Sequence, residues 1–205
     1  MRLAELSERS GVSTATIKYY LREGLLPAGA TISRTQAEYD TTHLERLRLI
    51  RTLREVANLS VAAIGTVVAR LDDDKASLTS LFGAVQHAVT PTETQSASAA
   101  GRRAAKALIA ELGWRHHRRS PLPRALARLM DTLLAEGFGT DQGALAPWID
   151  AAQSVARVEI DAITDDLPRA QAAYLVAVGV AVFGELLTLL RLLAQEDATI
   201  RRFGR

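Results

Sequence analysis

The sequence predicts a mainly α-helical fold that opens with two short helices, a tight turn between them and a small hairpin. Apolar residues recur at intervals of three and four over most of the 205 residues, which is the spacing of one helix face. Residues 28–39 are short, polar and rich in turn formers, as in a hairpin or wing. We therefore expect a small winged domain at the N-terminus and an all-helical bundle domain after it.

Glycines bound the first two helices. Residues 2–10 form the first helix, and Gly11 follows where a tight turn needs a positive φ. The second helix covers about residues 14–23, and Gly24 ends it. Helix, glycine-containing turn and helix are the sequence form of a helix-turn-helix. With the hairpin expected over residues 28–39, they predict a winged helix-turn-helix.

Two further helices complete this first domain. The third is expected over residues 41–56, where Asn58 breaks it, and Ser60 caps the fourth. The buried stripe of the third helix is Leu44, Leu47, Ile50 and Leu53. Its mostly exposed charged positions are Glu45, Arg46, Arg48, Arg51 and Arg54. The apolar face of the fourth helix is Val61, Ile64, Val67, Val68 and Leu71.

The rest of the chain also predicts helices, which proline and glycine separate. We expect these helices near residues 75–89, 98–117, 122–136, 145–164 and 168–196. Residues 90–97 are polar and indicate a boundary or linker.

The composition is that of a soluble globular protein, with 48% hydrophobic and 23% charged residues. There is no cysteine, which excludes disulfides and zinc–cysteine sites. The start of the chain has no apolar run of signal-peptide length, so a cytoplasmic protein is expected. The net charge is +2 overall, and it is unevenly spread, with +3 on residues 1–71 (ten basic, seven acidic) and −1 on the remainder. Arginine far outnumbers lysine, which hints at a GC-rich bacterial genome.

The most specific motif lies in the second helix and the turn after it. It reads Thr16-Ile17-Lys18-Tyr19-Tyr20, followed by Gly24-Leu25-Leu26-Pro27. Here the sequence resembles the MerR family of bacterial regulators, whose second helix typically reads T-I-R-Y-Y-x-x-x-G-L-L-x-P. Residues 39–50 resemble the family's third helix and residues 58–64 the start of its fourth. The resemblance covers about residues 1–71 and implies a winged helix-turn-helix that binds double-stranded DNA.

Several side chains of the second helix can donate to base edges and phosphates. The candidate DNA-binding residues are Thr14, Thr16, Lys18, Tyr19, Tyr20, Arg22 and, in the wing, Arg34. The resemblance implies that Lys18, Tyr19 and Tyr20 meet DNA. Either tyrosine could instead belong to the core, and Lys18 could be an ordinary solvated lysine.

The wing departs from the family pattern. Family members usually place Tyr-Arg shortly before the tyrosine at position 39, where this sequence has Gln36-Ala37. Arg34 could supply the missing phosphate contact, or it could merely be solvated.

The resemblance further implies a homodimer on a two-fold symmetric operator, with one recognition helix per subunit in the major groove. It also implies action by promoter distortion, which makes RNA polymerase an indirect partner. The helix at 75–89 spans only about two heptads, which is short for a coiled coil, so residues 168–196 are the candidate dimer helix. That helix is apolar enough for a membrane span to be considered, but its flanks do not show the basic pattern of a membrane span and we expect no membrane contact.

The expected domains are the DNA-binding domain at 1–74, a connecting helix and linker at 75–97, and an effector-binding or dimerisation domain at 98–205. We expect neither metal nor cofactor, because no cysteine is present and the adjacent His116 and His117 do not converge on one ion. Residues 114–119 are interpreted as a solvated basic helix end, or alternatively as a phosphate or DNA-backbone patch.

A small organic effector in the C-terminal helices is plausible, because apolar pockets between helices commonly hold one. The candidate ligand-binding residues are Trp114, Phe138, Trp148, Glu159, Tyr174, Phe183 and Glu185. Glu185 interrupts an apolar run and would be costly to bury unpaired, so it could face a cationic ligand or Arg157. The alternative is that the aromatic residues fill the core and that Glu185 and Arg157 form a structural pair.

Three other functions compete with a sequence-specific regulator. An enzyme is disfavoured, because the sequence shows no nucleophile–base grouping, phosphate loop or metal spacing. A non-specific architectural DNA-binding protein and a ligand-independent adaptor remain as alternatives. Preference for a specific site over random DNA distinguishes a regulator from an architectural protein.

Overall fold

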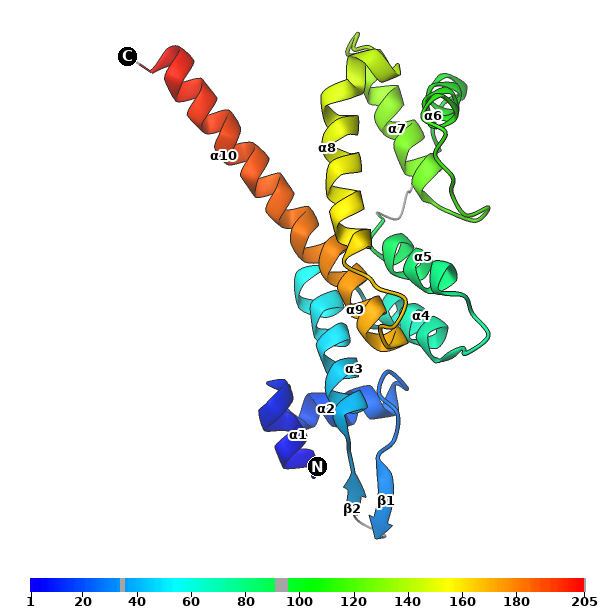
Figure 1. The fold of residues 1–205 in the computed structure, drawn as a ribbon, viewed down its shortest axis with the longest axis vertical. Helices are drawn as coiled ribbons and strands as arrows, with labels where there is room; N and C mark the ends of the chain where they lie inside the picture. The colour runs from blue at the N-terminus through cyan, green and yellow to red at the C-terminus, as the bar shows by residue number, and fades with distance from the viewer. Residues whose placement is uncertain (34–35, 91–95, 205) are drawn as a thin grey trace. The chain divides into compact units, whose positions relative to one another are not determined.

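The computed structural model describes residues 1–33, 36–90 and 96–204 (Figure 1). Its contacts divide the chain into two units, one of residues 1–85 with 165–205 and one of residues 86–164. The described part is mainly helical with one small hairpin, so the expected fold class is confirmed. These two units differ from the domains expected from the sequence, whose boundaries lie after residues 74 and 97. Those boundaries stay a prediction about independently folding domains.

The first unit begins with the helix-turn-helix. Helix α1 covers Leu3–Ser10, and Gly11 follows with a φ of 68°. Helix α2 covers Thr14–Arg22, and the hydroxyl oxygen of Ser13 accepts a hydrogen bond from the Thr16 N–H at its start. Gly24 has a φ of 69°, as expected for the residue that closes this helix.

A two-stranded antiparallel hairpin follows. Strand β1 covers Ala30–Ser33 and strand β2 covers Gln36–Glu38, with Ala30 opposite Glu38 and Thr31 opposite Ala37. The expected wing is therefore present. Arg34, the candidate phosphate contact at its tip, lies outside the described residues.

The third and fourth helices form the core of this unit. Helix α3 covers Thr41–Arg51 and continues as a π-helical turn, η1, over Thr52–Val56. Helix α4 covers Val61–Asp72 and is capped by Ser60, as expected. Buried residues from the predicted stripes are Leu44, Leu47, Ile50, Leu53, Ile64, Val67, Val68 and Leu71.

One position of α3 differs from the expectation of a mostly exposed charge. The side chain of Arg46 is only 11% exposed. Its guanidinium donates to the Asp72 carboxylate at the end of α4 and to the main-chain carbonyl of Leu25. The periodic pattern marked Arg46 as polar but could not show that a distant carboxylate would cover it.

The C-terminal helices of the chain belong to the first unit. They follow one another as α9 (Arg169–Val178), the π-helical turn η2 (Gly179–Phe183) and α10 (Gly184–Phe203). Helix α9 packs on α3 and α4. Helix α5 (Leu78–Ala88) lies mostly in this unit, with Leu81 and Val85 buried.

A single arginine ties α9 to the end of α4. The Arg169 guanidinium donates to the carbonyl oxygens of Arg70, Leu71, Asp73 and Ala76, at 2.7 to 3.2 Å. These carbonyls lie at or just beyond the negative end of the α4 dipole, where a cation is favourable. This contact is one physical reason why residues 165–205 group with the N-terminal helices.

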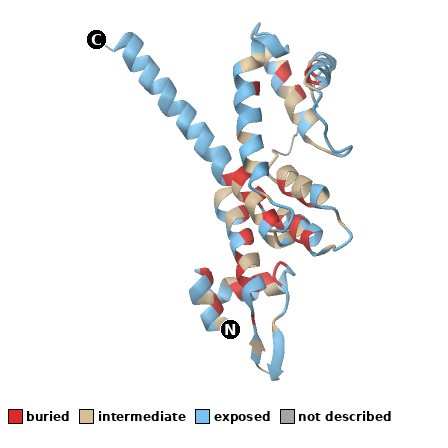
Figure 2. Ribbon diagram, viewed as in Figure 1, coloured by how far each residue is buried: buried red, intermediate tan, exposed pale blue. Residues whose placement is uncertain are grey.

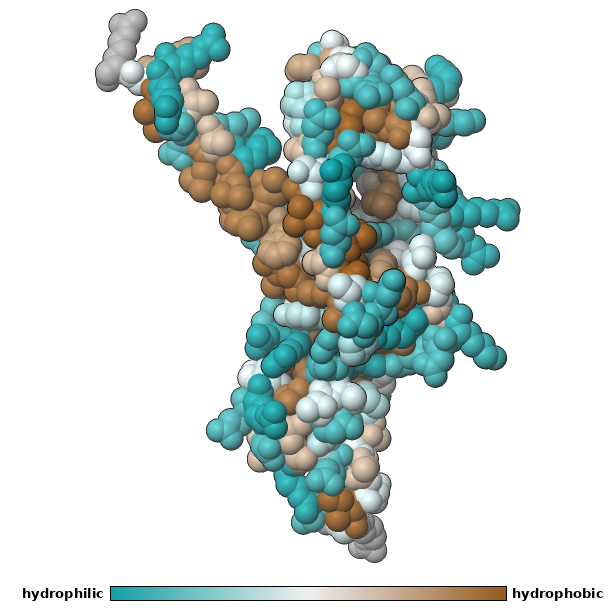
Figure 3. All heavy atoms as spheres, in the orientation of Figure 1, coloured by the Kyte–Doolittle hydropathy of each residue, from teal (hydrophilic) through white to brown (hydrophobic). Residues whose placement is uncertain are grey.

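Helix α10 is exposed along its whole length and has no buried residue (Figure 2). Leucines nevertheless fill its first half, and Figure 3 shows brown apolar side chains there and teal ones toward its C-terminal end. In the described chain, Arg169–Phe203 is the helix that is long and apolar enough to cross a membrane by length and composition alone. Only 28% of its most apolar window is buried.

The second unit contains α6 (Ala99–Glu111), α7 (Leu122–Ala135) and α8 (Gln142–Asp161). Helices α6 and α7 approach closely at Gly101, where an added Cβ would collide with the Ala127 carbonyl and the Asp131 side chain. Helix α6 ends at Glu111, before residues 114–119. The interpretation of that basic stretch as a helix end is therefore wrong, because Gly113 takes a φ of 64° that terminates the helix.

Candidate nucleic-acid interface

The basic and aromatic side chains of helix α2 differ in their exposure to solvent. Lys18 and Arg22 are exposed, and Tyr19 is 36% exposed. The Arg22 guanidinium lies 6.0 Å from the centre of the Tyr19 ring, within the range of a cation–π contact. These three side chains are available to a partner outside the unit.

Tyr20 is placed differently from its neighbour. It is 8% exposed and belongs to the core, and its ring centre lies 5.9 Å from that of Tyr19. Burial raises the pKa of the Tyr20 hydroxyl above its usual value. Of the two alternatives that the sequence left open for this residue, the ring position favours the structural one.

The two threonines at the start of α2 have distinct environments. Thr14 is exposed, whereas Thr16 is half-buried. The hydroxyl groups of Thr16 and Ser13 lie 2.8 Å apart and are hydrogen-bonded to each other. Thr16 thus takes part in the helix cap, and Thr14 is the freer donor of the pair.

The beginning of the chain contributes a residue that the sequence analysis missed. A hollow of about 520 Å³ is lined by Arg2 and Leu3 at the start of α1, Lys18 of α2, and Gln36 and Ala37 of the wing. Arg2 and Lys18 give this hollow two cations. No motif marked Arg2, because only the fold brings it beside α2 and β2.

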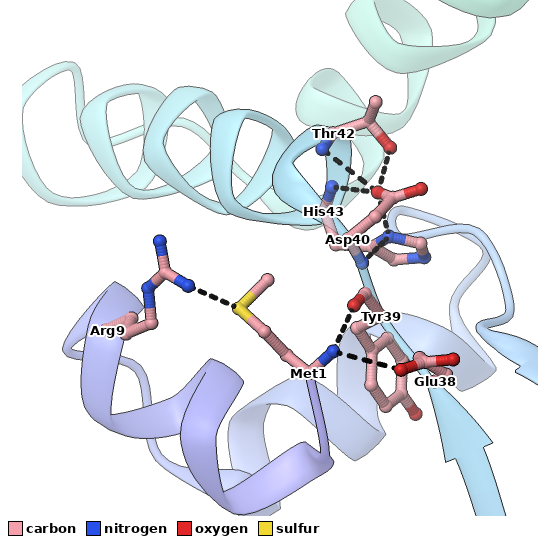
Figure 4. Close-up of polar contacts among 7 residues, drawn as sticks. All are labelled: Met1, Arg9, Glu38, Tyr39, Asp40, Thr42 and His43. Carbon is pink, nitrogen blue, oxygen red and sulfur yellow. Dashed lines mark hydrogen bonds and ion pairs between the residues drawn. The ribbon is translucent and has the colours of Figure 1, made fainter.

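Main-chain hydrogen bonds join Met1, the residue before Arg2, to Tyr39 at the end of the wing (Figure 4). The amino group of Met1 donates to the Tyr39 carbonyl at 2.7 Å, and the Tyr39 N–H donates to the Met1 carbonyl at 2.8 Å. The Tyr39 side chain is buried. The wing and α1 are therefore joined as one surface.

The wing is also joined firmly to α3. The Asp40 carboxylate accepts from the N–H groups of Thr42 and His43, and the Asp40 N–H donates to Nδ1 of His43 in a capping box (Figure 4). The hydrogen bond from the Thr42 hydroxyl and then the contact with the His43 side chain hold the pKa of the Asp40 carboxyl well below its usual range. Asp40 is therefore ionised at neutral pH, as a strong cap requires.

A contact from α3 supports the turn between α1 and α2. The Arg51 guanidinium donates to the Ser10 carbonyl at 3.2 Å, and this carbonyl is one of those left unpaired at the end of α1. An added Cβ on Gly11 would lie 3.2 Å from the same guanidinium. The arrangement sets the angle at which α2 is presented.

The groups on this surface are suited to binding a nucleic acid. It offers cations, hydroxyls and an aromatic ring on a helix about 13 Å long, a shape that fits a major groove. Within the described residues, no group of three or more His, Cys, Asp or Glu side chains could hold a metal ion.

The candidate ligand residues are divided between the two units and do not form one site within either. In the second unit, Trp114, Phe138 and Trp148 are exposed, and burial raises the pKa of the half-buried Glu159. In the first unit, Tyr174 is half-buried while Phe183 and Glu185 are exposed. Glu185 is exposed on α10, so the cost of burying it unpaired does not arise. Trp114 lines a cavity in the second unit.

Comparisons with known proteins agree with this geometry. Residues 1–71 match the family model described as "MerR HTH family regulatory protein". The whole chain is similar to a solved structure described as the "putative transcriptional regulator SCO5550 from Streptomyces coelicolor A3(2)". That similarity has 35% sequence identity and a TM-score of 0.77, and it covers 100% of this chain and 99% of the other. No curated protein matches the chain.

The family motifs, the helix-turn-helix with its wing, and the full-length similarity to a transcriptional regulator all support one assignment. The chain belongs to the MerR family of helix-turn-helix regulatory proteins, which are DNA-binding transcription regulators.

Proposed function

We propose that this regulator binds a two-fold symmetric operator as a homodimer and reads it through α2. The observation that carries the proposal is the exposed row Lys18, Tyr19 and Arg22 on the second helix of a helix-turn-helix. Lys18 and Arg22 carry the positive charge that phosphates attract. Arg2 and the wing extend the same surface. Arg34 is proposed as a further phosphate contact.

Substitution of the exposed residues tests the proposal. Lys18→Ala should weaken operator binding about 10- to 100-fold, because one base or phosphate contact contributes about 1–3 kcal/mol. Tyr19→Ala should weaken it less, and Thr14→Ala least. Lys75→Ala is the matched control, since this lysine precedes α5 and lies away from α2. Fluorescence anisotropy with a labelled operator gives the affinities, and unchanged binding by all three variants removes α2 from the interface.

We further propose that α10 forms the dimer by pairing with the α10 of a second copy. Apolar residues from the end of η2 along α10 include a row with alternating spacings of four and three residues, which is the pattern of a coiled coil. The seam is Val182, Leu186, Leu189, Leu193, Ile200 and Phe203, and all of these residues are exposed. Glu196 interrupts the seam once. Three heptads of unpartnered leucine-rich surface favour a helical partner over solvent.

Charge placed on the seam should separate the copies. Leu189→Glu puts a carboxylate where two helices would meet, and the sedimentation-equilibrium mass should fall from dimer to monomer. Thr188→Glu lies one residue away, off the seam, and serves as the control. A monomeric wild-type protein, or a dimer that survives Leu189→Glu, contradicts this arrangement.

The proposed regulation involves a small organic effector held by the C-terminal helical residues, with promoter distortion and RNA polymerase as the downstream elements. The proposal places the protein in the bacterial cytoplasm and assigns it no enzymatic step and no cofactor. The architectural alternative requires equal binding of operator and random DNA. The adaptor alternative requires operator binding that no small molecule changes.

A further inference from the structure

The second unit contains a cavity of about 770 Å³. It lies against α6, the beginning of α7 and the loop between these helices, so all its described walls come from one unit. Small-molecule sites in proteins are commonly about 300–1,000 Å³ in volume. The cavity is therefore large enough for a drug-sized organic molecule.

The apolar part of the cavity results from small side chains. Ala105 of α6 and Ala127 of α7 are buried at its wall, and Ile109 and Trp114 complete the apolar surface. Alanine at two facing positions of a helix pair leaves room that a leucine would fill. The Trp114 ring lines the cavity and is 42% exposed, so it can accept a flat ligand.

The polar part of the cavity has a single sign of charge. Arg102 and Lys106 are spaced four residues apart on α6, and Arg124 and Arg128 are spaced four apart on α7, so each pair shares a helix face. Among the residues that the structure describes, none that lines the cavity is acidic. Like charges around one cavity repel each other, and an anion among them relieves this repulsion.

Two of these cations lack an acidic partner. Lys106 and Arg124 form no ion pair with any residue in the described part of the chain, whereas the Arg102 guanidinium donates to the Ala97 carbonyl. Lysine and arginine donors form their strongest hydrogen bonds with carboxylates and phosphates. The cavity thus offers donors for one acidic group beside an apolar wall.

We propose that this cavity binds a small organic anion. Lys106 and Arg124 hold its carboxylate or phosphate group, and its apolar or aromatic body lies against Trp114 and Ile109. This ligand class is opposite in charge to the cationic ligand considered from Glu185. The role of the anion as the effector rests on the proposed function. The binding of the anion to the cavity does not rest on it, because this binding is measured without DNA.

The test uses the full-length protein and two nitroaromatic probes of equal size. Trp148→Phe leaves Trp114 as the single tryptophan, and a nitrobenzene ring quenches tryptophan fluorescence on contact. The probes are 4-nitrobenzoate, which is anionic, and 4-nitrobenzamide, which is neutral. Each is titrated in the Trp148→Phe background, alone and with Lys106→Gln and Arg124→Gln combined. Arg103→Gln is the matched control, because Arg103 is on α6 but does not line the cavity.

The proposal predicts saturable quenching by 4-nitrobenzoate and at least about tenfold weaker binding of the amide. The double variant should weaken 4-nitrobenzoate binding by about tenfold or more, with unchanged circular dichroism, and Arg103→Gln should stay within about twofold. Absence of saturable quenching, equal affinity for the two probes, or an insensitive double variant overturns the proposal. The proposal is also overturned if these basic residues bind DNA instead of a small anion. In that case the double variant would weaken binding to random duplex DNA, and 4-nitrobenzoate would not compete with that DNA.

The outcome of the probe experiment is independent of the outcome of the DNA-binding experiments. Lys18→Ala should leave 4-nitrobenzoate binding unchanged, because Lys18 belongs to the other unit. A wild-type protein that binds the probe but recognises no operator would count against the proposed function alone. Loss of probe binding with retained operator recognition would count against the anion site alone.

Discussion

Helices α1 to α4 of the first unit and the helices of the second unit bury different side chains. In the first unit, large aliphatic residues from α1, α2, α3 and α4 are almost completely buried, among them Leu6, Ile17 and Leu47. The buried cluster of the second unit is smaller in volume, with Ala105 and Ala127 beside a few larger residues. The comparison teaches that a filled core is needed to hold the DNA-binding helix α2 rigidly in place. Room for a ligand arises where the side chains are small.

The largest effect should come from emptying the filled core. Leu47→Ala removes a side chain that is 0% exposed and should lower the free energy of unfolding of the first unit by about 2–5 kcal/mol. Leu129→Ala is the control, because Leu129 is exposed on α7 in the second unit and should change stability by less than about 0.5 kcal/mol. Urea unfolding followed by circular dichroism measures both. Equal losses would erase the contrast between a buried and an exposed leucine.

The next effect concerns the arginine that joins α9 to α4. Arg169→Met removes four hydrogen bonds to carbonyl oxygens and should destabilise the first unit by about 2–4 kcal/mol. Amides of α9 should also exchange faster with solvent in the variant. Arg191→Met is the matched control, since Arg191 is exposed on α10 and its guanidinium donates to the Gln195 side chain. Slow exchange in the Arg169 variant would show that α9 is held by apolar packing alone.

A somewhat smaller loss of stability, limited to the second unit, should follow from a substitution at Gly101. Gly101→Ala forces α6 and α7 apart, because the new Cβ meets the Ala127 carbonyl, and the cost should be about 1–3 kcal/mol. Gly184→Ala is the control, because an added Cβ there meets no atom within 4 Å. Operator affinity should be unchanged in both variants. A loss of DNA binding by Gly101→Ala would mean that the two units are coupled.

The smallest effect should follow pH at the junction of the wing and α3. Asp40→Ala removes the cap of α3 and should cost about 1 kcal/mol near neutral pH. The folded-state pKa of Asp40 is below its ordinary value of 3.8. The stabilisation is therefore present above that value and declines as pH falls below it.

Asp40→Asn removes the negative charge but keeps the cap, because the asparagine side chain still accepts the hydrogen bonds. The stability difference between wild type and Asp40→Asn should shrink between about pH 6 and about pH 3. Urea titrations at each pH measure it. A constant difference would show that the charge of Asp40 does not contribute.

The sequence predicted the first unit well because its signals are local. Gly11 and Gly24 adopt the positive φ values that their positions suggested, Asn58 follows the end of the third helix, and Ser60 caps the expected fourth helix. The motif around Lys18 also identified the family. Position in space was harder to predict: the contacts of Arg46 with Asp72 and of Arg2 with the wing depend on residues far apart in the chain.

The sequence predicted the second unit less completely. Helix α6 ends at Glu111 because Gly113 terminates it, although the charged residues up to 117 suited a helix equally well. The candidate ligand residues were chosen as aromatic or acidic, so the basic residues beside Trp114 were overlooked. The signal was the repeated four-residue spacing of Arg102 and Lys106 and of Arg124 and Arg128, which places each pair on one helix face.

The most direct test of the central claim, that α2 makes this protein a sequence-specific regulator, is anisotropy with DNA from upstream of its own gene. A scrambled duplex of equal length is compared at two salt concentrations. The account predicts binding at least about 1,000-fold tighter to the upstream DNA at physiological salt, and binding of that DNA about 10- to 100-fold weaker in Lys18→Ala. Equal, steeply salt-dependent binding to both duplexes would contradict it and favour an architectural protein.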